Sequence, residues 1–148
     1  MPTPQDDLLF EPNGREPELA RYGEDNAPML GGERRLWPSL AAHLLSEQHR
    51  AHRRGDMFRV WVIRRLRSRL QHEALRLREE SSYSGEPLLP FTDEAALAQI
   101  EAERLEVLEE MEQARRWRRL RRAGELQDVL HIIDGYIAFW QDQLERRA

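Results

Sequence analysis

The chain has 148 residues and a formal net charge of −4, and a single domain is the expectation because domains of ~100–200 residues are the norm. It contains no Cys, which excludes a disulfide framework, a thiolate zinc site and a cysteine nucleophile. The longest stretch without a charged residue spans 36–46, and its 11 residues are too few for a membrane-spanning helix of ~20 residues.

Charge is segregated along the chain, although the net value is small. Residues 1–33 and 79–112 carry net charges of −6 and −10, whereas 34–78 and 113–122 carry +9 and +6. All 23 basic residues are Arg. Blocks of alternating sign can pair within the fold, between copies of the chain, or with other molecules. The first residues lack the basic and apolar regions of a secretory signal, so we expect a cytoplasmic protein or a part of a particle assembled in the cytoplasm.

Residues 1–32 are predicted to form an extended N-terminal arm. They contain five Pro and four Gly and show neither helical nor alternating apolar periodicity. Their low hydrophobicity and excess of acid cannot offset the entropy of ordering, so we expect the free arm to be disordered. Apolar anchors along this acidic tether suit docking onto a protein partner. The anchor residues are Leu8, Leu9, Phe10, Tyr22, Met29 and Leu30.

Residues 33–80 are predicted to form two helices. The first begins at Trp37-Pro38 and continues until Gly55, and Asp56 then suits the N-cap of the second. Apolar residues of the second helix recur every three or four positions to about residue 80. They are Val60, Ile63, Leu66, Leu70, Ala74 and Leu77. Residues 81–91, rich in Ser, Gly and Pro, are predicted to be a loop.

Residues 92–148 are predicted to form a long helical hairpin. Thr92 and the acidic residues after it suit a helix N-terminus, and this third helix is expected to run to about Arg122. Gly124 can end it, and the fourth helix then has the strongest apolar face in the chain. Because the link is so short, the two helices should fold back antiparallel. We therefore predict an all-α protein with an extended N-terminal arm, two mid-length helices and a C-terminal antiparallel helical hairpin with coiled-coil character.

Two groups of residues resemble metal ligands, but neither pattern is complete. His49, His52 and Asp56 would share one helix face, but Gly55 interrupts the helix between them. Asp128, His131 and Asp134 resemble the carboxylate and His pairs of helical metal bundles, which need that pair twice together with inward-facing Glu residues. Glycine-rich phosphate loops and the Gly-x-Ser-x-Gly motif are absent. We predict no catalytic, cofactor-binding or metal-binding residues and keep a helical-bundle metal protein or enzyme as the last alternative.

The densest basic cluster surrounds one Trp near the hairpin. Guanidinium groups beside an indole can contact phosphates and stack on bases, or they can pair with acidic residues of a partner, including Glu101–Glu112 of a neighbouring copy. The candidate contact residues are Arg115, Arg116, Trp117, Arg118, Arg119, Arg121 and Arg122.

The last helix has an apolar surface wider than one neighbouring helix can cover, so either the first two helices or another subunit should pack on it. The candidate residues are Ile132, Ile133, Tyr136, Phe139 and Trp140. The chain is therefore predicted to be a non-catalytic structural or adaptor subunit of a larger protein assembly, such as a virion or a secretion machine. A nucleic-acid-binding or transcription-modulating protein is the alternative.

Overall fold

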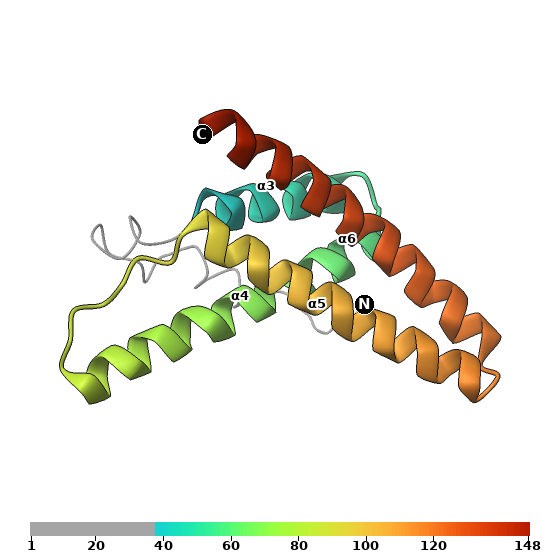
Figure 1. Cartoon of the computed structure of the whole chain (residues 1–148). Coiled ribbons are helices and arrows are strands. Elements are labelled where there is room, and N and C mark those ends of the chain that lie inside the picture. The colour runs from blue at the N-terminus through green and yellow to red at the C-terminus, as the bar shows by residue number, and fades with distance from the viewer. Residues whose placement is uncertain (1–37) are drawn as a thin grey trace. The chain divides into compact units, whose positions relative to one another are not determined.

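The computed structural model describes residues 38–148, and these form four helices and no strand (Figure 1). The helices are α3 (Ser39–Arg53), α4 (Met57–Ser84), α5 (Asp93–Arg116) and α6 (Leu120–Arg147). The predicted all-α fold with a C-terminal helical hairpin is thus confirmed. The predicted arm and its six anchor residues lie outside the described residues.

The junction between α3 and α4 follows local sequence signals. Gly55 takes a left-handed conformation, with φ of +74°, that costs Gly little and other residues more. Asp56 then caps α4 as predicted, because its Oδ1 accepts a hydrogen bond of 3.2 Å from the amide of Arg59. The helix extends beyond its predicted end near residue 80 by about one turn, to Ser84. Gly85, with φ of +76°, supplies the C-terminal cap, and its amide donates to the carbonyl of Ser81 at 2.9 Å.

The α5 helix begins as predicted and ends earlier than predicted. Thr92 caps its N-terminus by accepting a hydrogen bond of 3.1 Å from the amide of Ala95. The expected end near Arg122 is wrong: α5 ends at Arg116, and Gly124 lies inside α6. A continuous helix would have placed like charges three and four residues apart throughout the arginine run, where they repel one another. The turn separates these charges.

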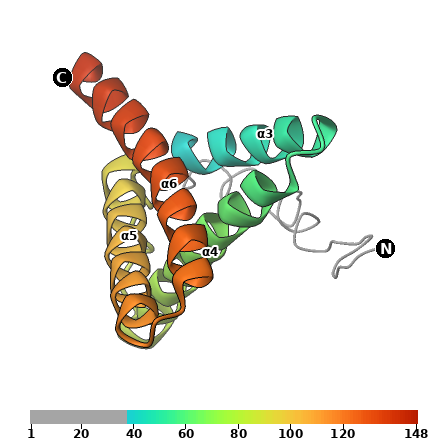
Figure 2. The same cartoon turned by 90° about the vertical axis from the view of Figure 1, so that its right-hand side faces the viewer.

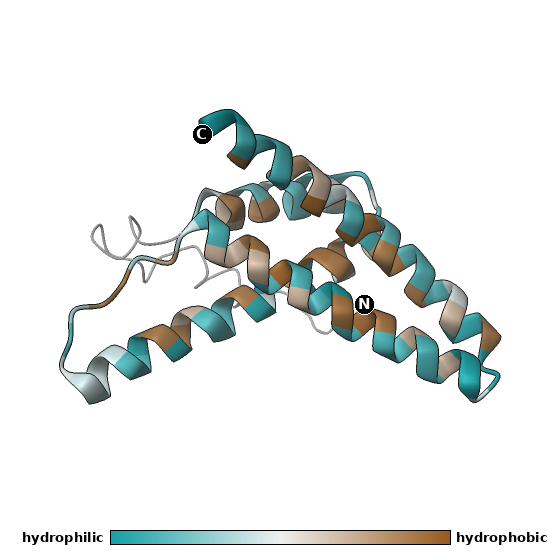
Figure 3. Ribbon diagram, viewed as in Figure 1, coloured by the Kyte–Doolittle hydropathy of each residue, from teal (hydrophilic) through white to brown (hydrophobic). Residues whose placement is uncertain are grey.

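The helices α5 and α6 pack side by side as an antiparallel hairpin, and α3 joins them near the open end (Figure 2). All four helices contribute to one apolar core, which includes Leu40 and Leu44 of α3, Leu66 of α4, Ile100 of α5 and Ile133 of α6, each at most 1% exposed. Hydrophobic residues lie mainly on the sides of the helices that face one another, and hydrophilic residues cover the outer sides (Figure 3).

Asp93, the first residue of α5, joins three helix ends and is only 8% exposed. Its carboxylate accepts hydrogen bonds from the Ser39 hydroxyl at 2.8 Å and the Leu40 amide at 2.9 Å, at the N-terminus of α3. It also accepts one of 2.6 Å from Nη1 of Arg147, near the end of α6. Because α3 has no side-chain cap of its own, Asp93 caps it from another helix.

Candidate functional site

The turn between α5 and α6, which we call the basic turn (residues 115–122), is built by backbone hydrogen bonds around one left-handed residue. Arg118 has φ of +57°, and its amide donates to the carbonyl of Arg115 at 3.0 Å. The amide of Arg119 donates to the carbonyl of Ala114 at 2.7 Å. This pair of bonds is the Schellman arrangement of helix C-termini, which usually has Gly at the left-handed position. The three residues 117–119 therefore reverse the chain.

Every residue of the basic turn is exposed. Trp117 and Leu120 leave 72% and 73% of their surfaces accessible. Trp117 also has no aromatic or cation–π contact with any residue between 38 and 148. Large apolar side chains this exposed, and surrounded by charged residues, are typical of contact sites.

Most arginines of the basic turn have no acidic partner in the described part of the chain. Arg122 lies 3.6 Å from carboxylate oxygens of Glu110 and Glu125. Within residues 38–148, the other five form no ion pair. These five unpaired residues are Arg115, Arg116, Arg118, Arg119 and Arg121. Their charge is therefore free to meet an external anion.

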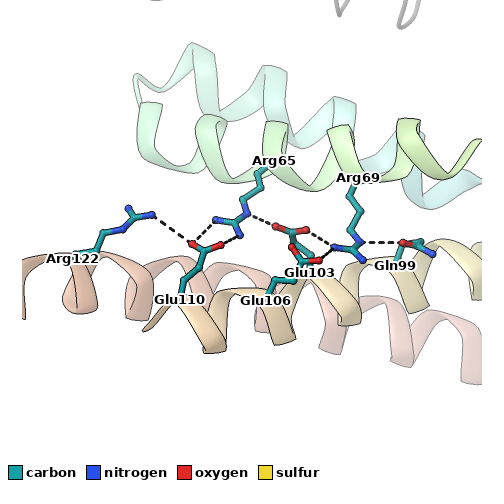
Figure 4. Close-up of polar contacts among 7 residues, drawn as sticks. All are labelled: Arg65, Arg69, Gln99, Glu103, Glu106, Glu110 and Arg122. Carbon is teal, nitrogen blue, oxygen red and sulfur yellow. Dashed lines mark hydrogen bonds and ion pairs between the residues drawn. The ribbon is translucent and has the colours of Figure 1, made fainter. Parts of the chain in front are cut away.

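The basic face of α4 is different, because acidic residues of α5 neutralise it inside the fold (Figure 4). Arg65 pairs with the buried Glu103 and donates to Glu110 at 2.6 Å. Arg69 donates to Glu103 at 2.9 Å and to Glu106 at 2.6 Å. The hydrogen bond to Arg69 and its positive charge hold the pKa of Glu106 below its ordinary value. The basic turn, in contrast, keeps five of its six arginines without an acidic partner in the described helices.

The apolar surface predicted on the last helix is largely covered by the other helices of this chain. Ile133, Tyr136 and Trp140 are buried in the core, and Ile132 is half-buried. Phe139 remains 44% exposed and stacks on the ring of His43 in α3, with centroids 4.9 Å apart. Helices α3 and α4 thus take the place that a second subunit could have occupied.

Polar contacts fix this packing. The indole Nε1 of Trp140 donates a hydrogen bond to Nδ1 of His43 at 3.0 Å. The hydroxyl of Tyr136 donates to Glu47 at 3.2 Å and accepts from Nη1 of Arg59 at 3.1 Å. Burial raises the pKa of Tyr136, and its hydrogen bond to Arg59 opposes that effect. These groups are therefore engaged in holding α6 against α3 and α4.

The residues considered as metal ligands do not come together. Among residues 38–148, no three His, Asp or Glu side chains are grouped as a metal site requires. Asp128 and His131 are exposed, and Asp134 pairs with Arg104. His49 and His52 are likewise exposed at the end of α3.

Three features of the structure were not anticipated from the sequence. The capping role of Asp93 joins residues more than fifty positions apart and leaves no local pattern. The left-handed Arg118 lacks the Gly that would mark such a turn. Leu105 of α5 is a large apolar residue that is 60% exposed. Its position four residues from both Glu101 and Glu109 is the signal that could have placed it on the outer face.

No protein-family model, curated protein or solved structure matches this chain. Among the described helices, none has the length and apolar character that crossing a membrane requires.

Proposed function

We propose that this chain is a non-catalytic structural or adaptor subunit of a larger assembly, and that the basic turn is the surface through which it binds an acidic partner. One observation carries the proposal: five arginines without ion pairs among the described residues surround the exposed side chains of Trp117 and Leu120. Apolar anchors within a ring of charge are common at protein interfaces, and Trp and Arg are the residue types enriched there.

The rest of the helical unit supports a role in binding. Tyr136 and Trp140 of α6 are engaged in the core, and the arginines of α4 shown in Figure 4 are engaged with α5. The basic turn lies at the end of a long hairpin whose two helices pack along their length. A partner therefore meets a preorganised surface, which lowers the entropy cost of association.

The test measures binding of a labelled acidic peptide rich in Glu and Leu by fluorescence anisotropy. The variant with Arg118→Gln, Arg119→Gln and Arg121→Gln should bind about tenfold more weakly or worse, because the charge complementarity disappears. The matched control Arg53→Gln, Arg54→Gln and Arg146→Gln removes the same number of exposed charges elsewhere and should bind nearly as well as the parent. Equal weakening in both variants would show that net charge, and not the basic turn, determines binding.

Nucleic-acid binding by the same turn is the second candidate function. The observation in its favour is the unstacked ring of Trp117 between arginines, because bases stack on exposed aromatic rings while guanidinium groups contact phosphates. Affinity for a single-stranded oligonucleotide should then fall steeply with salt. Replacing three arginines of the turn by Gln should reduce the slope of log K against log salt by about 0.7 for each phosphate that the protein no longer neutralises. Absence of oligonucleotide binding at low salt, together with binding of the acidic peptide, would leave the adaptor proposal alone.

A further inference from the structure

The outer side of α5 carries a second exposed surface, opposite in charge to the basic turn. Its residues recur every three or four positions, so they form one stripe along the helix, and all of them are exposed. We call this the acidic stripe, and its members are Glu94, Ala98, Glu101, Leu105, Glu109 and Glu112. Leu105, at 60% exposure, is its large apolar residue.

The four glutamates of the acidic stripe form no ion pair with any residue between 38 and 148. Glu101 accepts one hydrogen bond of 3.2 Å from the amide group of Gln141, and the other three have no side-chain hydrogen bond in that range. The stripe thus combines free carboxylates with one exposed Leu, and the basic turn combines free guanidinium groups with exposed Trp117 and Leu120. The two surfaces are complementary in charge and in apolar content.

Spacing along α5 allows two copies to satisfy both surfaces together. Arg116 follows Leu105 by 11 residues, which is close to three helical turns and about 16 Å, so it lies on the same side of α5 as the acidic stripe. When two α5 helices lie antiparallel along this side, Leu105 of each copy can face the basic turn of the other. Glu101, one turn before Leu105, then lies toward Arg119 of the other copy, and Glu109 lies toward Arg116. Both sets of contacts are related by a single two-fold axis.

We propose that a second copy of this chain is an acidic partner of the basic turn, and that the two copies form a two-fold symmetric dimer through antiparallel α5 helices. This inference rests on the proposed function of the turn and names its partner. Residues 38–148 contain equal numbers of Arg and acidic residues, so the described helices add no net repulsion between two copies, and the net charge of −4 lies in residues 1–37. The opposite surfaces of the two copies attract each other.

Charge reversal and charge swap test the pairing by sedimentation velocity and light scattering at low salt. The turn variant carries Arg116→Glu and Arg119→Glu, and the stripe variant carries Glu101→Arg and Glu109→Arg. All four positions are exposed, so thermal melting should show that each variant still folds. The parent is expected to be a dimer. Each variant should dissociate about 10⁴-fold more readily, because each substitution occurs in both copies and so reverses four close charge pairs, each of which contributes on the order of tenfold in affinity.

The swap variant, which combines all four substitutions, restores opposite charges across the interface and should dimerise again. Recovery in the swap variant identifies the turn and the stripe as partners. Dissociation of both reversed variants without recovery in the swap variant would overturn the pairing. A parent chain that remains monomeric at high micromolar concentration would also overturn it, whereas binding of the acidic peptide to the basic turn would still support the proposed function.

Discussion

Arg118 has a left-handed backbone conformation. At the two other described positions with this conformation, the chain has Gly. Gly55 and Gly85 have φ of +74° and +76°, and Arg118 has φ of +57°. An L-residue in the left-handed region costs roughly 1–2 kcal/mol relative to the right-handed one. Retaining Arg there keeps a positive charge in the middle of the basic turn at the expense of stability.

Replacing Arg118 by Gly should therefore increase the free energy of unfolding. The expected gain is about 0.5–1 kcal/mol, because Gly relieves the strain but has a more flexible unfolded state. The control is Arg116→Gly, two residues earlier in helical conformation, which should lose roughly 0.5–1 kcal/mol. Urea unfolding measures both. A loss of stability in Arg118→Gly would mean that the Arg118 side chain contributes more to the fold than its exposure indicates.

Asp93 links stability to pH. Burial acts to raise its pKa, but the hydrogen bonds from Arg147, the Leu40 amide and the Ser39 hydroxyl outweigh burial and hold the pKa below its ordinary value. A carboxylate with a depressed folded-state pKa contributes stability above its unfolded pKa of about 3.9. That contribution disappears as the pH falls through the folded-state value.

Asp93→Asn should lower the free energy of unfolding by about 1–3 kcal/mol at neutral pH, because the charge-assisted hydrogen bonds are removed. The difference between parent and variant should shrink as the pH falls from about 4 through the lower folded-state pKa, where the carboxylate of the folded parent becomes protonated. Urea unfolding across this pH range measures the difference in the free energy of unfolding. The other carboxylates occur in both proteins, so their titration cancels in this difference. A difference that does not change with pH would show that Asp93 acts by shape alone.

At the scale of the elements, local signals predicted the helix starts better than the helix ends. Asp56 and Thr92 both cap helices as expected, because an N-cap bonds to an amide only three residues away. The end of α5 depends on where its apolar side meets that of α6. This tertiary contact cannot be predicted from a short stretch of sequence. The run around Trp117 also consists of good helix formers, so the pattern alone favoured a continuous helix through it. The capping of α3 by Asp93 depends likewise on tertiary packing.

The hairpin can be tested at one buried and one exposed position of α6. Ile133 is fully buried, so Ile133→Asp places a carboxylate in the apolar core. The expected loss is several kcal/mol, comparable to the whole stability of a small domain. Ala138 is exposed on the same helix, and Ala138→Asp should change stability by no more than ~0.5 kcal/mol. Thermal melting compares the two. Similar melting of both variants would contradict the inward orientation of Ile133.

At the scale of the whole described unit, the ion-pair network of α4 and α5 joins the first helical pair to the hairpin (Figure 4). Glu103 is the central member, because its side chain is only 7% exposed and contacts both Arg65 and Arg69. Glu106 reaches Arg69 from the surface, with 54% of its side chain exposed. The members of such a network contribute unequally to stability, because removing a buried member leaves the remaining charges poorly solvated.

Glu103→Ala should therefore cost about 2–3 kcal/mol, somewhat less than a fully buried pair because both arginines keep some contact with water. Glu106→Ala should cost at most ~1 kcal/mol, in the range of surface ion pairs. Because one apolar core includes all four helices, calorimetry should show Glu103→Ala melting in a single transition, lowered by roughly 4–8 °C per kcal/mol. High salt should weaken the contribution of Glu106 more than that of Glu103, because exposed charges are screened more strongly than buried ones. Two separate transitions in Glu103→Ala would show that α3 and α4 fold independently of the hairpin once the network is broken.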